Sequence, residues 1–280
     1  GKKTFLISNI NYANAISCFF FRKINKLKII TIERTPVQEL NYYSSYFKYF
    51  KNITIKILIK FFYKYALIRI GNSDPVSRDL ERICKCKVMT IIPYIKINKK
   101  KYKKFNKEQV NLSWIGRISP EKNIKDLLNV INYLKKINFK LNIVSDKKID
   151  VKKLNINKKI YNRVNFFKFN SINLRKIYKK TDILISTSLY EGFPNVIADA
   201  INYNCLIISA KNHGGARQLI GNEDKGLYYN LNDPHDLFEK IKYSLKNRTL
   251  VKKKITKSKI NLIKLSKKNN NSYKNLFNKL

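Results

Sequence analysis

The sequence predicts an α/β protein of about two domains, with parallel sheets joined by crossover helices, and three observations carry this prediction. Short runs rich in β-branched residues alternate with amphipathic stretches, a pattern that is typical of parallel strands joined by crossover helices. The length of 280 residues corresponds to two domains at roughly 150 residues each. Hydrophobic residues make up 44% of the chain, so each domain can bury a core despite a formal net charge of +41.

The first predicted domain covers residues 1–95 and consists of crossover units. Its apolar runs have the length of buried strands, and the sequence Gly-Asn-Ser-Asp-Pro at 71–75 marks a turn. In chain order, we expect a strand at 4–10, a helix at 12–26, a strand at 27–32, a helix at 55–65, a strand at 66–70, a helix at 76–84 and a strand at 88–92.

A linker at residues 96–107 separates the two domains, because six lysines at 99–107 and the lack of an apolar period predict a solvated segment. The second domain covers residues 108–246. Its expected strands lie at 110–115, 139–144, 164–169, 183–186, 205–209 and 226–229, and its expected helices at 121–137, 174–179, 194–203, 216–220 and 234–245. In the tail, residues 247–280, Leu and Ile at helical spacing predict one or two surface helices.

The positive charge raises the question of a polyanionic partner. Lys outnumbers Arg 49 to 10, and the chain is also rich in Asn, Ile, Tyr and Phe, all encoded by A/T-rich codons, so genome composition accounts for the charge without a ligand. Arg, which contacts bases and phosphates bidentately, is scarce, and the lysines are spread along the chain. We therefore expect no specific nucleic-acid binding, whereas attraction to an anionic membrane stays open.

Other function classes are excluded by composition. The longest apolar candidate, residues 53–70, is interrupted by lysines and Arg69, so it does not reach the ~18 to 20 apolar residues of a membrane-spanning helix. Four cysteines without a CxxC pair, and no signal peptide, favour a reducing cytoplasm. The two histidines are too few for a His-rich metal site, and we expect no metal.

The first candidate site segment is the turn after the strand at 110–115. In a doubly wound sheet, ligands bind beyond the carboxyl ends of the strands. Gly116 lets a ligand approach the backbone, while Arg117 and Lys122 flank the start of a helix and can close on a diphosphate. The alternative is that both are ordinary surface cations of a Lys-rich chain.

The second candidate segment surrounds the start of the helix at 194–203. Glu191 lies just before this helix and Asp199 lies about one and a half turns into it, so both carboxylates can face one cleft. The backbone from Gly192 to Asn195 offers an anion site at a helix N-terminus. Taken alone, Glu191 can equally be a helix cap and Asp199 a solvated helix residue.

Together these motifs resemble one known family. The sequences GRISPEK at 116–122, EGFPNVIADA at 191–200 and NHGGARQLIGNEDKGLYYNLNDPHDL at 212–237 resemble the retaining glycosyltransferases of family four, which have the GT-B fold of two Rossmann-like domains. IGNSDPVSRDL at 70–80 and IIPY at 91–94 extend the resemblance back to the interdomain region.

The resemblance implies a nucleotide-diphosphate-sugar donor, bound as a substrate by the second domain, with no metal or other cofactor. Arg117 and Lys122 would bind the diphosphate and stabilise the charge of the leaving group. Glu191 would lie beside the transferred sugar, and Asp199 would accept hydrogen bonds from the ribose hydroxyls. The family has Glu at this last position, so Asp199 is one methylene shorter.

The remaining donor contacts would come from backbone groups. The resemblance implies that the amides around Phe193, Pro194 and Asn195 contact the diphosphate and the sugar, with Gly116 and Gly192 beside them. Two places depart from the family pattern. The expected first-domain His is missing from residues 7–12, and the turn at 145–148 lacks the expected glycine.

The predicted function is that of a hexosyltransferase-type enzyme that transfers a sugar with retention to a surface-polysaccharide or lipid-linked glycan acceptor. We expect it in the cytoplasm, peripheral at the inner face of the cell membrane. The alternative is a non-catalytic basic module that binds anionic membrane or RNA. Residue 1 is Gly, and the resemblance places it in the later half of the first domain. We expect an N-terminally truncated chain with an incomplete first domain that binds donor without transfer; a short natural form is the alternative.

Overall fold

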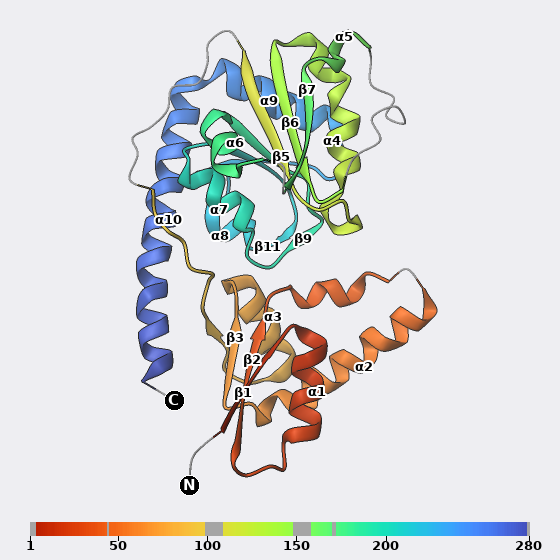
Figure 1. Ribbon diagram of the computed structural model, residues 1–280, viewed down its shortest axis with the longest axis vertical. Helices are drawn as coiled ribbons and strands as arrows, with labels where there is room; N and C mark the ends of the chain where they lie inside the picture. Colours follow the sequence, from red (N-terminus) through yellow and green to blue (C-terminus); the bar gives the residue numbers. More distant parts are fainter. Residues whose placement is uncertain (1–3, 44, 99–108, 148–157, 170–171, 279–280) are drawn as a thin grey trace.

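The computed structural model describes residues 4–43, 45–98, 109–147, 158–169 and 172–278. Two parallel sheets lie one above the other in Figure 1, and a long C-terminal helix runs beside both. The α/β class that the sequence predicts is confirmed. Most of the predicted linker, from residue 99 onward, lies outside the described residues.

The first sheet has four parallel strands in the order β1-β2-β3-β4. These strands are β1 (Thr4–Asn9), β2 (Leu27–Glu33), β3 (Ile68–Gly71) and β4 (Met89–Thr90). The connections between them are α1 (Asn11–Phe21), η1 (Val37–Asn41), α2 (Tyr46–Phe62), η2 (Tyr63–Tyr65) and α3 (Asp74–Cys84).

The two faces of this first sheet are covered by different parts of the chain. One core cluster joins α1, α2 and α3 to the sheet through Cys18, Ile29, Ile59 and Leu80. The other face carries Ile30, Ile68, Ile70 and Ile91, and the C-terminal helix packs Tyr273 and Leu276 against it.

The second sheet has six parallel strands in the order β12-β10-β8-β5-β6-β7. They are β5 (Val110–Ile115), β6 (Phe139–Ser145), β7 (Val164–Lys168), β8 (Ile183–Ser186), β10 (Leu206–Ala210) and β12 (Leu227–Tyr229). The chain first adds β6 and β7 on one side of β5 and then returns to the other side with β8. The strand order therefore reverses between β5 and β8, which is the topological switch point of the sheet.

Helices cover both faces of the second sheet, one with α4, α9 and the start of α10 and the other with α6, α7 and α8. The helical segments are η3 (Pro120–Lys122), α4 (Ile124–Ile131), η4 (Tyr133–Lys136), α5 (Lys158–Tyr161), α6 (Leu174–Lys180), α7 (Asn195–Asn202), α8 (Ala216–Ile220), α9 (Pro234–Lys246) and α10 (Arg248–Phe277). A small parallel pair, β9 (Tyr190–Glu191) and β11 (His213–Gly214), lies at the edge that faces the first sheet.

Several predicted helices begin or end at other residues in the structure. The helix expected at 12–26 ends at Phe21, and a tight turn at Ile24 leads into β2. The helix expected from residue 55 begins at Tyr46, because Ser45 caps it by accepting a hydrogen bond from the Lys48 amide at 3.3 Å. The helix expected at 121–137 is broken at Asn123, whose φ of 42° lies in the left-handed region that Asn tolerates.

The tail forms a single helix, α10, which is the first of the two expected alternatives, but this helix is only partly a surface helix. Val251, Ile255 and Leu262 on α10 are buried against the second domain. Further along, the side-chain amide of Asn269 donates to the Ile92 carbonyl at 2.8 Å. One helix thus ties the two domains together. Among the described residues, no helix is both long and apolar enough to cross a bilayer.

Candidate active site

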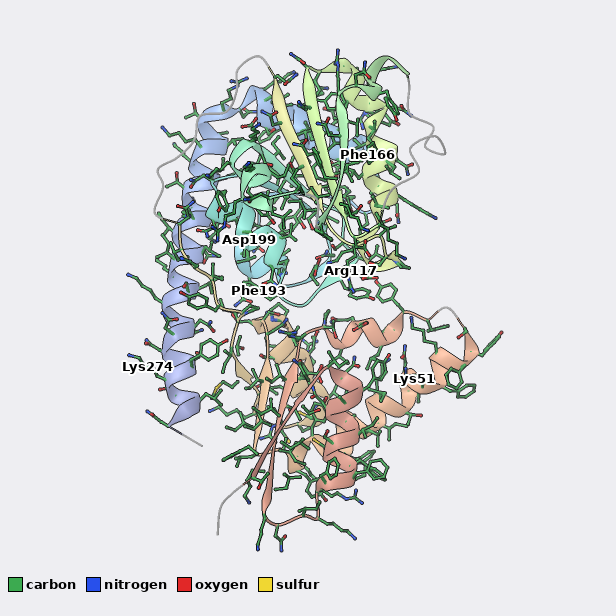
Figure 2. All side chains as sticks on the ribbon, viewed as in Figure 1. Lys51, Arg117, Phe166, Phe193, Asp199 and Lys274 are labelled. Atoms are coloured by element: carbon green, nitrogen blue, oxygen red, sulfur yellow. The ribbon has the colours of Figure 1, made fainter. Side chains whose placement is uncertain are left out.

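The candidate site lies at the switch point of the second sheet. The turn after β5 carries Gly116 and Arg117, and the segment after β8 carries Thr187 to Glu191. Because the carboxyl ends of β5 and β8 are neighbours at this edge, segments more than 60 residues apart in the sequence lie close together. Figure 2 shows Arg117 and Phe193 at this edge, which faces the first domain.

A cavity of about 200 Å³ collects most of the predicted site residues. Seven of the nine predicted residues line it: Gly116, Arg117, Lys122, Glu191, Phe193, Pro194 and Asn195. Gly192 lies between two of them in the chain, and Asp199 lies elsewhere. The roles of these residues stay predictions, but the structure brings this group together.

Lys122 and Glu191 form an ion pair inside the cavity. The Lys122 ammonium contacts Glu191 Oε1, and the Ser188 hydroxyl donates to the same oxygen at 2.8 Å. The side chains of Lys122 and Glu191 are only 21% and 17% exposed, so water screens this pair less than a surface pair. The pair holds a cation and a carboxylate at the cavity wall in fixed positions.

The backbone around Lys122 is braced by the neighbouring strand end. Trp114 Nε1 donates to Thr187 Oγ1 at 2.9 Å, and the Thr187 hydroxyl donates to the Lys122 carbonyl at 2.6 Å. The Leu189 amide donates to the Glu121 carbonyl at 2.8 Å. The sequence motifs did not identify Thr187 and Ser188 as site residues. Their signal was only their position between a buried strand and Glu191.

Arg117 lies at the mouth of the cavity, and its side chain is 66% exposed. It pairs with Glu121 at 3.1 Å, and the Ser119 hydroxyl donates to Glu121 at 2.6 Å. Burial alone would raise the pKa of Glu121, but the Ser119 hydrogen bond and the positive charges of Arg117 and Lys122 lower it below its usual value. Glu121 therefore stays ionised and holds the Arg117 guanidinium near the cavity.

The turn at Ser145 to Lys147, which lacks the glycine of the family pattern, contacts the loop that follows β5. Asp146 Oδ1 accepts a hydrogen bond from the Ile118 amide at 2.7 Å. This bond lowers the pKa of Asp146. The turn therefore fixes the loop that carries Arg117.

The N-terminus of α7 opens on the same cavity, which Val196 and Ile197 also line. First-turn amides of a helix have no intrahelical acceptor, so they and the helix dipole favour an anion there. The backbone amides predicted to contact the diphosphate, those around Phe193, Pro194 and Asn195, need one correction. Pro194 has no N–H group, and the Asn195 amide already donates to the Phe193 carbonyl at 3.0 Å. The amides of Val196 and Ile197 are the better candidates.

Asp199 lies in a second, neighbouring cavity of about 660 Å³. Tyr178, Tyr203 and the segment 94–98 between the domains also line this cavity, and Asn195 is common to both cavities. Partial burial of the carboxyl raises the pKa of Asp199. Figure 2 places Asp199 farther from the first domain than Phe193. The two carboxylates of the motif thus face adjacent cavities and not one.

The first domain contacts the site at Gly192. A Cβ atom on Gly192 would lie 1.8 Å from the Arg34 carbonyl oxygen at the end of β2, so only glycine fits this approach. The side-chain amide of Asn72, just after β3, donates to the same carbonyl at 2.8 Å. The Tyr42 and Tyr190 rings also contact across the domains, with centroids 5.0 Å apart. These contacts are tertiary, so the motifs could not predict them.

At the end of β1, where the family His is missing, the structure places a strained residue. Ile10 has a φ of 68°, which is unfavourable for a β-branched side chain. Its amide donates to the Ile32 carbonyl at 3.1 Å, and this bond fixes the residue at the start of α1. Backbone strain of this kind occurs often at ligand-binding edges.

Two parallel sheets with flanking helices, bridged by the C-terminal helix α10, with cations and a helix N-terminus at the switch point of the second sheet, form a two-domain architecture of the GT-B type. The predicted GT-B fold is confirmed by two solved structures. TarM superposes with a TM-score of 0.76 at 20% identity, over 98% of this chain and 54% of TarM. Anabaena Alr3699/HepE in complex with UDP-glucose superposes with a TM-score of 0.72 at 14% identity, over 97% of this chain and 78% of that chain.

The sequence also identifies the family. The family model described as Glycosyl transferases group 1 matches residues 95–261, and the chain belongs to this family. This match supports an enzyme of the glycosyltransferase class and gives no support to the alternative of a non-catalytic basic module. The predicted family resemblance is thereby confirmed.

Two curated relatives come from Campylobacter jejuni subsp. jejuni serotype O:2. One is the N-acetylgalactosamine-N,N'-diacetylbacillosaminyl-diphospho-undecaprenol 4-alpha-N-acetylgalactosaminyltransferase, 24% identical over an alignment of 215 residues that covers 72% of this chain and 57% of the relative. The other is the GalNAc-alpha-(1->4)-GalNAc-alpha-(1->3)-diNAcBac-PP-undecaprenol alpha-1,4-N-acetyl-D-galactosaminyltransferase, 28% identical over an alignment of 164 residues that covers 55% of this chain and 44% of the relative. The chain spans about half the length of these relatives.

Proposed function

We propose that this protein transfers a hexose-type sugar, with retention, from a nucleotide-diphosphate-sugar to a lipid-linked or surface-polysaccharide glycan. The observation that carries the proposal is the meeting of Lys122, Glu191 and the α7 N-terminus in one cavity at the switch point, with Arg117 at its mouth. Such an arrangement suits a ligand with a diphosphate next to a neutral hydroxylated group.

The cations would stabilise the leaving nucleotide diphosphate. As the bond between the sugar and the diphosphate breaks, negative charge grows on the diphosphate oxygens, and fixed positive charges lower the barrier for this step. Lys122 and Arg117, together with the Val196 and Ile197 amides, supply this charge from the chain itself. The proposal therefore needs no metal or other cofactor.

Both cations are balanced by carboxylates in the structure. The ion pairs Lys122–Glu191 and Arg117–Glu121 keep each cation in place without leaving a buried charge unpaired. Donor binding then exchanges a carboxylate partner for a phosphate oxygen. The released Glu191 carboxylate can accept hydrogen bonds from the sugar hydroxyls.

The nucleoside would extend from the first cavity toward the second. Asn195 lines both cavities, so a ligand with its diphosphate at the α7 N-terminus can place its ribose beside Asp199. The proposed role of Asp199 is to accept hydrogen bonds from the ribose hydroxyls.

A lipid-linked acceptor is supported by the names of the two relatives, which describe transfer to undecaprenol-diphosphate glycans. We extend this acceptor class to the present chain, and with it a peripheral position at the cytoplasmic face of the cell membrane. The excess of lysines, 49 of 280 residues, suits an anionic membrane surface.

The proposal is tested by thermal unfolding in the presence of UDP-, GDP- and ADP-sugars. A donor that binds only the folded state raises the unfolding temperature in a concentration-dependent way. We expect one nucleotide class to stabilise the wild type and to stabilise Lys122→Ala much less. Lack of stabilisation by every member of the panel would refute the proposal.

A further inference from the structure

The α2 helix has a second apolar face that nothing in the described chain covers. Phe47, Phe50, Ile57 and Phe61 are 81%, 65%, 49% and 52% exposed. Their spacing of three, seven and four residues, with Thr54 between, places them along one side of the helix. Over the ~21 Å from Phe47 to Phe61, at 1.5 Å per residue, they form an apolar stripe.

The opposite side of α2 already packs on its own domain. Asn52, Ile55 and Ile59 are buried there, and the side-chain amide of Asn52 donates to the Leu40 carbonyl at 3.1 Å. The helix does not need Phe47, Phe50 or Phe61 for this packing. An ordinary surface helix would carry polar residues at these positions, so packing within the domain does not account for the stripe.

Lysines flank the stripe, and the surrounding segment has no acidic residue. Lys48, Lys51, Lys60 and Lys64 are exposed, and residues 40–73 contain no Asp or Glu. Aromatic side chains bordered by lysines match the interface of an anionic bilayer, where rings lie at the headgroup level and ammonium groups contact lipid phosphates. A neutral protein partner would not require this charge pattern.

The segment that leads into α2 contacts the segment that carries Glu191. Tyr42, four residues before the first turn of α2, contacts Tyr190, the neighbour of Glu191. Figure 1 shows the N-terminal end of α2 projecting from the first domain on the side away from α10, and Figure 2 places Lys51 on that projection. The N-terminal end of α2 is therefore four residues along the chain from a contact with the candidate site.

We propose that the α2 stripe (Phe47, Phe50, Ile57 and Phe61) docks the protein on an anionic lipid bilayer, with the aromatic rings in the interface and the lysines on the headgroups. The inference rests on the proposed function for the membrane-linked acceptor and adds the surface that brings the cleft to it.

The test compares vesicle binding of the wild type and the double variant Phe47→Glu/Phe50→Glu by co-sedimentation. Vesicles contain phosphatidylcholine alone or with about one third phosphatidylglycerol. Because both side chains are exposed, the variant retains the packing of α2. We expect binding to the anionic vesicles that falls on the order of a hundredfold in the variant, from lost burial of two rings and added repulsion.

The matched control is Tyr161→Glu/Tyr243→Glu, which makes the same charge change at exposed aromatic residues of the second domain. It should bind anionic vesicles within about threefold of the wild type, because two charges out of +41 change the general attraction little. An equal loss in both variants would show that net charge alone drives binding and would overturn the proposal.

Three other outcomes would also overturn the proposal. These are unchanged vesicle binding by the α2 variant, a wild-type dimer that the variant converts to a monomer without lipid, and single-stranded RNA binding that the variant alone loses. Failure of the proposed function is separate, because thermal stabilisation by nucleotide sugars reports on Lys122. A wild type that binds vesicles through α2 but no nucleotide sugar would refute only the function.

Discussion

Replacing Glu33 with Gln should remove a strong pH dependence of stability. Glu33 is at the end of β2 and is 2% exposed. Its Oε1 accepts hydrogen bonds from the side-chain amide of Asn14 at 2.7 Å and from the Tyr63 hydroxyl. Burial raises the pKa of Glu33 to about 7, and these two hydrogen bonds only partly oppose the rise.

The sign and size of the effect follow from the pKa values of Glu33 in the folded and in the unfolded protein. A carboxyl with a higher pKa in the folded protein stabilises the fold fully below its unfolded pKa and loses this contribution as the pH rises toward the folded pKa. The window therefore runs from about 4.5 to about 7. The difference corresponds to about 3 kcal/mol of unfolding free energy that the wild type loses across the window. The substituted amide stays neutral at every pH in this window, so the variant does not lose this contribution.

The assay is urea unfolding followed by circular dichroism at several pH values between 4 and 8. The quantity of interest is the stability of the wild type minus that of Glu33→Gln, because other titrating groups cancel in this difference. It should fall by about 3 kcal/mol from pH 4 to pH 8. Glu223→Gln, at an exposed carboxylate, controls for the change in net charge. A difference that does not change with pH would refute the assignment of a neutral buried Glu33.

The remaining predictions concern the candidate site. Lys122→Ala should weaken nucleotide-sugar binding, measured by calorimetry, by ~1.5 to 3 kcal/mol. Arg117→Ala should weaken it less, because the Arg117 side chain is 66% exposed. A larger loss for Arg117→Ala than for Lys122→Ala would contradict the placement of Lys122 in the cavity. Asp199→Asn should weaken binding of a nucleoside diphosphate but not of inorganic diphosphate; equal losses for both ligands would remove its ribose role. Gly192→Ala should abolish sugar transfer and retain donor binding, because the new methyl would lie 1.8 Å from the Arg34 carbonyl oxygen and force the domains apart. Full transfer by this variant would show that the contact between Gly192 and Arg34 is dispensable.

The strands and the switch-point site were predictable because their signals are local. A run such as Leu206–Ala210 is buried on both faces, so selection for apolar β-branched residues marks it in the sequence. The site motif lies in two turns at strand ends, where a glycine, two cations and a helix start occur together within a few residues. For this reason the sequence located Lys122 and Glu191, which the structure joins in an ion pair.

Features set by tertiary contacts were not predictable in the same way. The start of α2 was missed because none of residues 46–50 is buried, so this turn of the helix has no core-facing period in the sequence. The position of Asp199 relative to the first cavity depends on how α7 packs beside the segment 94–98. The requirement for glycine at 192 comes from a carbonyl more than 150 residues earlier. Nothing in the local sequence encodes these distances.

The Glu33 substitution also tests how the first domain reaches the site. The Glu33 carbonyl accepts the Asn72 amide at 2.9 Å, and the Asn72 side chain holds the Arg34 carbonyl that contacts Gly192. Glu33 directly precedes Arg34, whose carbonyl contacts Gly192. Ionisation of Glu33 thus acts one residue away from this contact between the domains. If the charge of ionised Glu33 loosens this contact, the rate of sugar transfer by the wild type should fall between pH 6 and pH 8. The rate of Glu33→Gln should not fall over this range. Parallel pH profiles of the two proteins would show that the backbone bonds of Asn72 hold the β2 end regardless of the charge on Glu33.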